Sequence, residues 1–262
     1  MQPVLDVKEM SMNFGGLRAL DEIGLSVEKE QIVALIGPNG AGKTTFFNCV
    51  TGIYDPTEGD VLINPPGKKS KRINGYKPNR VTELGVARTF QNIRLFPDMT
   101  VLENVMIGCH CRTKTGIIAS ILRPPSARHE EERVVHDSYE LLRRMGLHKH
   151  YNDLAKNLPY GAQRKLEIAR ALATEPFLLM LDEPAAGMNP QETQELKDLV
   201  VAMKEEFEIA ILLIEHDMKM VMTLSDYIYV MEYGKLIAEG VPAEVSENPD
   251  VIRAYLGEDA DA

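Results

Sequence analysis

The chain has 262 residues, 44% of them hydrophobic and 26% charged, which is ordinary for a water-soluble globular protein. Its net charge of −10 argues against a nucleic-acid-binding protein, because such proteins usually carry a basic surface. The longest apolar stretches, such as 209–214, are far shorter than the roughly 20 residues that a membrane-spanning helix needs. Asp6, Lys8 and Glu9 interrupt any apolar N-terminal signal, so we expect a cytosolic chain.

The first part of the chain is predicted to form strands around a glycine-rich loop. Runs of apolar and β-branched residues predict strands at 4–8, 23–27, 32–36 and 61–63. A turn at 14–16 separates the first two strands, and the third strand is wholly apolar, as expected for burial on both faces. Residues 64–80 combine prolines and glycines with basic residues and favour an exposed basic loop.

From residue 99 to residue 145 the pattern changes to that of helices. Apolar spacing and capping residues predict helices at 101–107, 128–145, 161–173 and 191–207. Thr100 and Glu103 have the spacing of a capping box before the first helix. One face of the last helix is apolar and predicted to face the core, through Leu196, Leu199, Val200, Met203 and Phe207.

Strands return in the last third of the chain, at 177–181, 209–214, 227–231 and 235–238. Strands and helices therefore alternate at both ends of the chain, with helices alone in the middle. This order predicts an α/β core that carries a helical subdomain.

A glycine loop of the phosphate-binding type follows the apolar strand. Its pattern is glycine, four residues, then Gly-Lys-Thr, set between a buried strand and a helix. Glycines let successive backbone N–H groups point at a phosphate oxygen, and the helix that begins near Lys43 adds its dipole. A plain glycine-rich turn would leave the Lys-Thr-Thr spacing unexplained. We predict nucleoside triphosphate binding at Gly37, Pro38, Asn39, Gly40, Ala41, Gly42, Lys43, Thr44 and Thr45.

Two more polar clusters follow buried strands. Asp182 and Glu183 come directly after the apolar run 178–181, at the strand end where open α/β sheets bind their ligands. One carboxylate there can hold Mg²⁺ through water, and the other can point at an attacking water. His216 follows the apolar run that ends at Ile214, so we expect it beside Glu183 at the γ-phosphate.

Several motifs follow one another along the chain. They are the phosphate loop, Gln91 within 89–92, the segment 158–162, Asp182-Glu183, the segment 187–189 and His216. They occur in the order seen in ATP-binding cassette (ABC) ATPases, and the chain resembles that family over nearly its whole length. Other segments are similar to the larger ATP-binding subunit of bacterial branched-chain amino acid importers. These are 88–91, 160–161, 166–170, 182–187, 214–218, 250–256 and the block 115–125.

The resemblance implies a fold and a domain organisation. It implies an α/β fold with a P-loop NTPase (RecA-like) core, an antiparallel β subdomain and an inserted α-helical subdomain. The whole chain, 1–262, would form a single ABC ATPase domain. Residues 1–91 and 175–262 would form the catalytic core with the β subdomain, and about 92–174 the helical subdomain that carries the signature segment.

The resemblance also implies ligands for the metal. Lys43 would reach the β- and γ-phosphates, and the hydroxyl of Thr44 would ligate Mg²⁺. Asp182 and Gln91 would complete the metal site. Gln91 would also report the γ-phosphate to a membrane subunit through the loop 92–98.

Three further roles follow from the same resemblance. Glu183 would act as the general base on water, and His216 would steady both Glu183 and the γ-phosphate. Phe14 falls where the family stacks an aromatic ring on adenine. The alternative role of Phe14 is packing within the strand connection.

The five-residue signature segment departs from the family's usual Leu-Ser-Gly-Gly-Gln. It consists of Leu158, Pro159, Tyr160, Gly161 and Ala162, and only the first and fourth residues match. In the family this segment reaches the γ-phosphate of ATP held by a partner. Pro159 offers neither a hydroxyl nor an N–H, whereas the Gly161 N–H at a helix N-terminus stays available. We expect a weakened contact in trans.

The inter-subunit loop departs from the family pattern as well. It consists of Gly187, Met188 and Asn189, and Asn189 stands where the family usually has Asp. This change puts the coupling between the two ATP sites in doubt. Because the signature segment is irregular too, we expect unequal sites and a heterodimer.

The resemblance implies an ATP-binding subunit that hydrolyses ATP to drive uptake of branched-chain or related amino acids, with ATP and Mg²⁺ as cofactors. Its partners would be two integral-membrane permease subunits and a second ABC ATPase subunit in a head-to-tail heterodimer. A periplasmic or extracellular solute-binding protein would act indirectly, and no nucleic acid is expected. The chain would lie peripherally on the cytoplasmic side of the inner membrane.

Other functions stay open at this point. An importer of urea or amides, or an exporter of lipids, would use a similar subunit, because the solute never touches the ATPase. A soluble ABC ATPase serving ribosomes or DNA repair is disfavoured, since such proteins usually carry two cassettes or a long coiled-coil insertion. A GTPase is disfavoured because the sequence contains no Asn-Lys-x-Asp.

Overall fold

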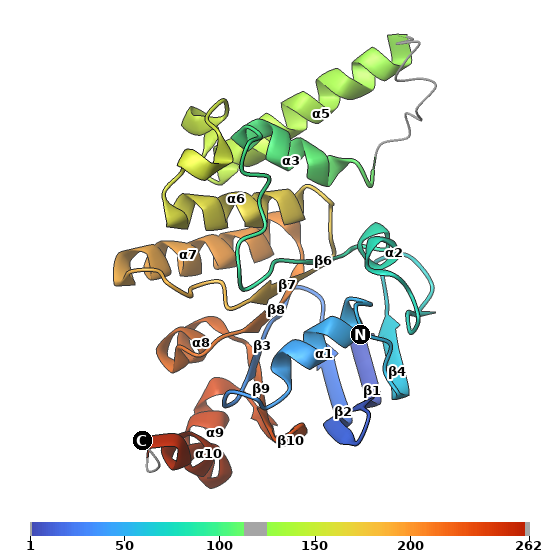
Figure 1. Cartoon of the computed structure of the whole chain (residues 1–262), viewed down its shortest axis with the longest axis vertical. Coiled ribbons are helices and arrows are strands. Elements are labelled where there is room, and N and C mark those ends of the chain that lie inside the picture. The colour runs from blue at the N-terminus through green and yellow to red at the C-terminus, as the bar shows by residue number, and fades with distance from the viewer. Residues whose placement is uncertain (1, 113–124, 260–262) are drawn as a thin grey trace.

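Two β-sheets and a block of helices build the chain, with the helical block at one end of the molecule (Figure 1). The structure, a computed structural model, describes residues 2–112 and 125–259. Except for Pro125, the block 115–125 that contributes to the family resemblance lies outside these residues. No helix in the described part of the chain combines the length and the apolarity needed to cross a membrane.

The larger sheet has its strands in the order β10-β9-β3-β8-β7-β6. They are β3 (Ile32–Ile36), β6 (Val86–Arg88), β7 (Leu178–Asp182), β8 (Ala210–Ile214), β9 (Tyr227–Glu232) and β10 (Lys235–Gly240). Neighbouring strands are parallel, except that β9 and β10 are antiparallel. The strands β3, β7 and β8 are buried throughout, as their unbroken apolar sequences predict.

The smaller sheet is antiparallel, in the order β2-β1-β4-β5. Its strands are β1 (Leu5–Phe14), β2 (Leu17–Val27), β4 (Glu58–Ile63) and β5 (Lys71–Arg72). The turn between the first two strands is confirmed, but the strands predicted at 4–8 and 23–27 are too short. The register of β1 against β2 shifts between Val7 and Met10, where Glu9 has a φ of 48°. This irregularity hides the continuation of the strand from a period-two pattern.

The predicted basic loop at 64–80 is only partly exposed. Lys68 is exposed, but Ile73 is 3% exposed and packs into a hydrophobic core. Asn74 fastens the segment to β4, because its Oδ1 accepts a hydrogen bond from the Val61 N–H at 2.9 Å. The prediction of a wholly solvated loop is therefore wrong, since one apolar residue and one amide tie it to the small sheet.

The helical block consists of α3 (Val101–Cys109), α5 (Pro125–Arg144) and α6 (Tyr160–Leu172), with the short turns η1 (His148–His150) and η2 (Ala155–Asn157). Thr100 and Glu103 form the predicted capping box at the start of α3. The helix α5 projects away from the sheets, and α6 lies beside α7 (Figure 1). The remaining helices are α1 (Lys43–Val50), α2 (Pro78–Glu83), α7 (Pro190–Phe207), α8 (Met218–Leu224), α9 (Pro242–Ser246) and α10 (Pro249–Asp259).

The fold class predicted from the sequence is confirmed, with an α/β core, an antiparallel β subdomain and a helical insertion. The sequence did not predict α2, α8, α9 and α10. The first three of these have 6, 7 and 5 residues, which is too few for a helical period to show. The domain boundaries at 91/92 and 174/175 stay predictions.

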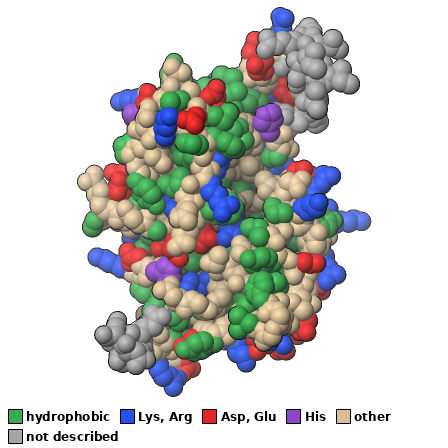
Figure 2. All heavy atoms as spheres, viewed as in Figure 1, with side chains coloured by type: hydrophobic (Ala, Val, Ile, Leu, Met, Phe, Trp, Pro, Cys, Tyr) green, Lys and Arg blue, Asp and Glu red, His purple; other side chains and the backbone are tan. Residues whose placement is uncertain are grey.

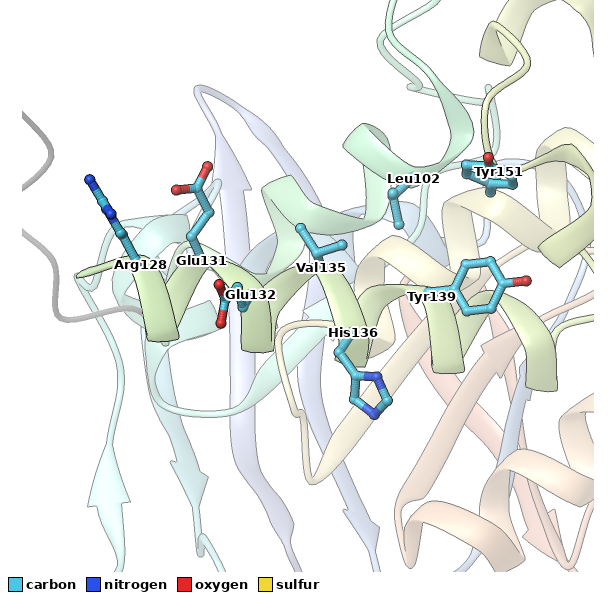
Figure 3. Close-up of a pocket in the computed structure, with 8 residues that line it drawn as sticks. All are labelled: Leu102, Arg128, Glu131, Glu132, Val135, His136, Tyr139 and Tyr151. Atoms are coloured by element: carbon cyan, nitrogen blue, oxygen red, sulfur yellow. The ribbon is translucent and has the colours of Figure 1, made fainter. Parts of the chain in front are cut away.

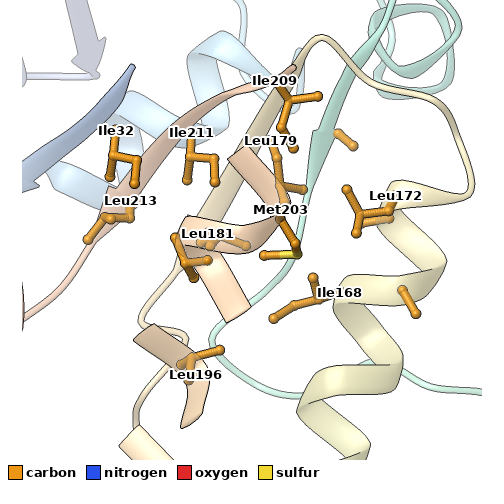
Figure 4. Close-up of a cluster of buried hydrophobic side chains, with 14 of the residues drawn as sticks. Ile32, Ile168, Leu172, Leu179, Leu181, Leu196, Met203, Ile209, Ile211 and Leu213 are labelled. Carbon is orange, nitrogen blue, oxygen red and sulfur yellow. The ribbon is translucent and has the colours of Figure 1, made fainter. Parts of the chain in front are cut away.

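A hydrophobic core joins the large sheet to the helices on one of its faces (Figure 4). Leu179, Leu181 and Leu213 project from β7 and β8 toward α6 and α7 (Figure 4). From α7, Leu196 and Met203 are buried among them, and Leu199 and Phe207 are partly buried. The apolar face predicted for α7 is thus confirmed. A second core lies on the other face of the sheet, between it and the small sheet.

This packing makes Leu213 a sensitive test of the fold. Leu213 is 0% exposed, so Leu213→Ala is expected to lower the free energy of unfolding by about 2–5 kcal/mol, because it leaves a cavity. Val201 of α7 is 39% exposed, and Val201→Ala is expected to change that free energy by about 0.5 kcal/mol or less. Urea denaturation measures both. Equal effects of the two variants would contradict the assignment of this core.

Candidate functional site

The glycine loop joins β3 to α1 and depends on glycine at both of its ends. Gly37 has a φ of 146°, and a Cβ at this position would lie 2.0 Å from the Met231 carbonyl oxygen of β9. Gly42, the N-cap of α1, has a φ of 103°. Glycine tolerates both this backbone conformation and this close approach. Any other residue at position 37 would push the loop away from the sheet.

Lys43 opens α1 and lies across the loop, where it is 6% exposed. Its Nζ donates to the carbonyl oxygens of Gly37 at 2.5 Å and Pro38 at 2.8 Å. A cation next to backbone N–H groups at a helix N-terminus makes the loop a site for anions. The other residues of the loop range from exposed (Asn39, Gly40, Thr44) through half-buried (Pro38, Gly42, Thr45) to buried (Gly37, Ala41).

Asp182 is the last residue of β7 and is 3% exposed. Its Oδ2 accepts a hydrogen bond from Arg88 Nη2 at 2.6 Å, in a buried ion pair. Arg88 ends β6 and also donates through Nη1 to Asn48 Oδ1 of α1 at 2.7 Å. The carboxylate is thus fixed between the sheet and the helix of the glycine loop. Sequence reasoning missed this role, because nothing in the sequence marks Arg88 as buried.

The structure brings Glu183 into contact with Gln91 and His216, which were predicted from separate segments of the sequence. Glu183 Oε1 lies 2.6 Å from His216 Nε2, and Glu183 Oε2 accepts a hydrogen bond from Gln91 Nε2 at 2.6 Å. The side chains of Glu183 and His216 are 15% and 40% exposed. Glu183 has a φ of 47°, a left-handed conformation that is uncommon outside glycine. Such strain concentrates at functional sites, where the surrounding structure maintains it.

Glu215 holds the backbone next to Glu183 and His216 in place. The sequence did not predict this role. Glu215 is 4% exposed and accepts hydrogen bonds from the backbone N–H groups of Ala185 at 2.8 Å and His216 at 3.1 Å. Burial raises the pKa of the Glu215 carboxyl above its usual value, against the lowering effect of these two bonds. The carboxylate fixes the backbone that follows Glu183 and the backbone of His216. A polar residue directly after a buried strand was the signal that could have found it.

Comparison with protein families identifies this arrangement. The family model described as ABC transporter matches residues 20–186, which include the glycine loop, Gln91 and Asp182. The chain belongs to the ABC transporter family. A second model, described as Branched-chain amino acid ATP-binding cassette transporter, matches residues 235–261.

Curated relatives match the chain over nearly its whole length. The high-affinity branched-chain amino acid transport ATP-binding protein LivG of Escherichia coli K12 is 48% identical over 257 residues, which cover 98% of this chain and 99% of LivG. The high-affinity branched-chain amino acid transport ATP-binding protein BraF of Pseudomonas aeruginosa is 46% identical over 257 residues, which cover 98% of this chain and 99% of BraF.

Solved ABC cassettes have the same fold. The ADP conformation of MJ1267, an ATP-binding cassette of an ABC transporter, matches with a TM-score of 0.84 and 33% identity over 98% of this chain and 100% of that one. The structure of cbiO1 from Clostridium perfringens matches with a TM-score of 0.80 and 28% identity, over 98% of this chain and 100% of that one.

The signature segment of this cassette lies at the start of α6. Pro159 is the N-cap, and Tyr160 is the first helical residue and 44% exposed. A Cβ on Gly161 would lie 2.9 Å from Glu192 Oε1, so the Glu192 side chain of α7 lies against this glycine. Leu158 is 5% exposed and packs into the core, where Ala162 is partly buried. Of the five residues, Pro159 and Tyr160 are thus the ones turned toward solvent.

Residues 187–189, which the sequence predicts to be the inter-subunit loop, lie beside Tyr160 of the signature segment. Gly187 has a φ of 78°, and a Cβ there would lie 3.5 Å from the Tyr160 ring. Met188 is partly buried against the core. Asn189 is the N-cap of α7, and its Oδ1 accepts hydrogen bonds from the N–H groups of Gln191 at 2.9 Å and Glu192 at 3.0 Å. Asn at this position therefore has a definite structural role, which Asp would fill equally well.

Phe14 ends β1 and is 41% exposed. Its ring meets the ring of Tyr54 edge to face, with centroids 5.2 Å apart. Tyr54 follows α1 and is 37% exposed. Sequence reasoning missed Tyr54, because an aromatic residue in a turn-rich segment gave no sign of its partner. Tyr54 thus packs against Phe14 from the segment that follows the C-terminal end of α1.

The cavity drawn in Figure 3 lies on the helical block, away from these residues. It has a volume of about 650 Å³ and is lined by α5 side chains together with Leu102 and Tyr151 (Figure 3). None of the predicted site residues lines it.

On the face of the molecule shown in Figure 2, hydrophobic, acidic and basic side chains are interspersed.

The capping role of Asn189 can be tested by substitution. Asn189→Ala is expected to lower the free energy of unfolding by about 1 kcal/mol, because two N–H groups at the start of α7 lose their acceptor. Asn189→Asp keeps an acceptor and serves as the matched control, with stability close to that of the parent. Urea denaturation of the three proteins measures this. An unchanged urea midpoint for Asn189→Ala would contradict the cap.

Proposed function

We propose that this chain is the ATP-binding subunit of an importer of branched-chain amino acids. The match of residues 235–261 to a model described by that substrate class carries the proposal. These residues include β10, α9 and all of α10, and they lie outside the general cassette match at 20–186. The names of the relatives at 48% and 46% identity support the same substrate class. Neither name points to the alternatives of urea, amide or lipid transport, or to a soluble ABC ATPase.

The donor groups of the site fit a nucleotide with its metal. Lys43 and the backbone N–H groups of 39–45 would hold the phosphates of ATP. The Thr44 hydroxyl, the Asp182 carboxylate and the Gln91 amide oxygen are oxygen donors, which Mg²⁺ prefers. Gln91 uses its Nε2 toward Glu183, so its amide oxygen stays available for a metal. Bound MgATP supplies the phosphoanhydride bond and a cation that offsets the phosphate charge.

Phe14 would hold the adenine ring by stacking, with Tyr54 packed edge to face against it. Phe14 is 41% exposed, so part of its surface is open to a planar ligand.

Glu183 would accept a proton from the attacking water. His216 Nε2 and Gln91 Nε2 each bind one of its carboxylate oxygens, and each oxygen keeps a second lone pair for water. The two partners orient the carboxylate in advance, so less entropy is lost on reaching the transition state. His216 is 40% exposed at its side chain and would also reach the γ-phosphate.

A second ABC ATPase would close over this site from the other side, in a head-to-tail dimer. The solvent-facing Pro159 and Tyr160 of the signature segment would then meet the partner's nucleotide, with Gly187 and Asn189 beside them. Pro159 has no hydroxyl or N–H to offer to a phosphate. We therefore infer two unequal sites and a heterodimer.

The transport role requires membrane partners. We infer that the chain binds to the cytoplasmic side of the inner membrane and contacts two permease subunits through the loop 92–98. A periplasmic or extracellular solute-binding protein would act on it only through those permeases. No nucleic acid takes part, in keeping with the net charge of −10.

Glu183→Gln tests the catalytic assignment. The amide keeps the shape of the side chain but is a far weaker base, so hydrolysis is expected to fall by about 10²–10⁴-fold with ATP binding retained. ATP turnover by the purified subunit with its partners and binding of a fluorescent ATP analogue measure the two quantities. Glu205→Gln, at an exposed position of α7, is the matched control. Hydrolysis at the parental rate by Glu183→Gln would remove Glu183 from this role.

The substrate class is tested in cells that lack this chain. Uptake of labelled leucine, isoleucine and valine is expected to be lost and to return with the parental gene, but not with Glu183→Gln. Labelled urea and acetamide serve as controls, and their uptake is expected to stay unchanged. Loss of urea or amide uptake in place of leucine uptake would replace the proposed substrate.

A further inference from the structure

The segment between β6 and α3 contains Gln91, and side chains of the helical block hold its backbone. Residues 89–99 have no helix or strand, and a loop of this kind normally turns its polar backbone groups to water. Here the partners are Arg164 and Glu167 of α6 and Asn104 of α3. They are 0%, 2% and 0% exposed. The loop is therefore built into the helical block.

Arg164 makes the central contacts. Its Nη1 donates to the carbonyl oxygen of Phe90 at 2.6 Å, and its Nη2 donates to that of Gln91 at 2.6 Å. Arg164 Nη1 also lies 2.8 Å from Glu167 Oε2. Glu167 Oε1 accepts the Arg94 N–H at 3.1 Å. This buried ion pair thus binds the backbone on both sides of the Gln91 side chain.

Asn104 extends the attachment along the loop. Its Oδ1 accepts the Phe96 N–H at 2.9 Å, and its Nδ2 donates to the Phe96 carbonyl oxygen at 3.1 Å. The Arg94 guanidinium lies over the Phe90 ring, 4.1 Å from its centroid. The backbone from residue 90 to residue 96 is therefore attached to α3 and α6 at several points.

The side chain of Gln91 points away from the helical block and toward Glu183, which follows β7 of the large sheet. The Nε2 of Gln91 donates to Glu183 Oε2 at 2.6 Å, whereas the backbone carbonyl oxygen of Gln91 accepts from Arg164. Three residues earlier, Arg88 is paired with Asp182 in the large sheet. The chain thus changes its attachment from the sheet to α6 between residues 88 and 91. Gln91 is the residue that connects the two.

We propose that Arg164 is a positioning residue for ATP hydrolysis, because it sets where Gln91 lies relative to Glu183. The inference rests on the proposed role of Glu183 as the general base. Arg164 touches neither the nucleotide loop nor Glu183 in the contacts above, so it acts through Gln91.

The presence of a buried Arg164–Glu167 ion pair, where apolar residues could pack as well, supports the inference. A buried ion pair stabilises a fold no better than apolar residues of the same volume, because both charges lose their hydration. A guanidinium, however, can bind two carbonyl oxygens and a carboxylate at fixed angles, which a lysine ammonium cannot do as well. The geometry of Arg164 uses this property on the two carbonyl groups that bracket Gln91.

A double-mutant cycle with Gln91 tests the proposal. The double substitution Arg164→Met and Glu167→Gln removes both buried charges together, which avoids leaving one of them unpaired. We expect this variant to melt near the parental temperature and to lose about 10- to 100-fold in kcat, because small misplacements at a reacting centre have effects of this size. The KM for ATP is expected to change little. Lys165→Met, on the same helix with an exposed partner in Glu195, is the control that keeps parental kcat.

The cycle separates positioning from a general loss of folded protein. In a Gln91→Ala background, the same double substitution is expected to leave kcat unchanged, because the side chain that it positions is gone. A loss of kcat as large in this background as in the parent would overturn the proposal. An unchanged kcat in the parental background would overturn it too.

A spectroscopic measurement tests the attachment without any enzymatic activity. The chain contains no tryptophan, so Phe90→Trp provides a single tryptophan, which can be excited selectively, next to the Arg164 contact. Removal of the Arg164–Glu167 pair is expected to shift the emission to longer wavelength and to increase its quenching by acrylamide, and Lys165→Met is expected to do neither. Unchanged emission and quenching would show that Arg164 does not hold this loop and would overturn the proposal.

The two hypotheses fail in different ways. Absence of ATP hydrolysis in the parental complex contradicts the proposed function, while the fluorescence result still decides whether Arg164 holds the loop. Parental hydrolysis with additive effects in the cycle contradicts only the positioning role.

Discussion

The parallel pairing of β3, β8 and β7 is the constraint on which the rest of the site depends. Asp182 lies in register with Ile214, and Leu35 lies in register with Ile214 from the other side. Three strand ends therefore meet at one edge of the sheet, and each continues into a polar segment. The glycine loop follows β3, Glu183 follows β7, and His216 follows β8 after one residue. The 2.6 Å contact between Glu183 and His216 is a direct result of this register.

The same constraint explains which parts of the site the sequence could predict. A strand buried on both faces is an unbroken apolar run, so the polar residue that follows it is conspicuous, as with Asp182 and His216. Arg88 and Arg164 were missed for the opposite reason. A buried arginine looks in the sequence like one of the many arginines on a surface, and only its partners in space reveal it. Glu215 lies between these cases, because its position after β8 was visible but its backbone partners were not.

The structure also changes the weight of the two departures from the family pattern. Asn189 in place of Asp looks like a loss of function in the sequence, yet it caps α7 through its side-chain oxygen, as Asp would. This departure therefore gives no support to unequal sites. Pro159 is different, because it lies at the N-cap of α6 and has neither a hydroxyl nor an N–H to offer to a phosphate. The argument for unequal sites thus depends on the signature segment alone.

The position of the Glu183 carboxylate has two independent origins. One partner, His216, is attached to the sheet through β8, and the other, Gln91, is attached through its backbone to α6. A shift of the helical block relative to the sheet would therefore change one hydrogen bond to the carboxylate and leave the other intact. A single amide side chain links the orientation of the proposed base to the part of the cassette that carries the signature segment.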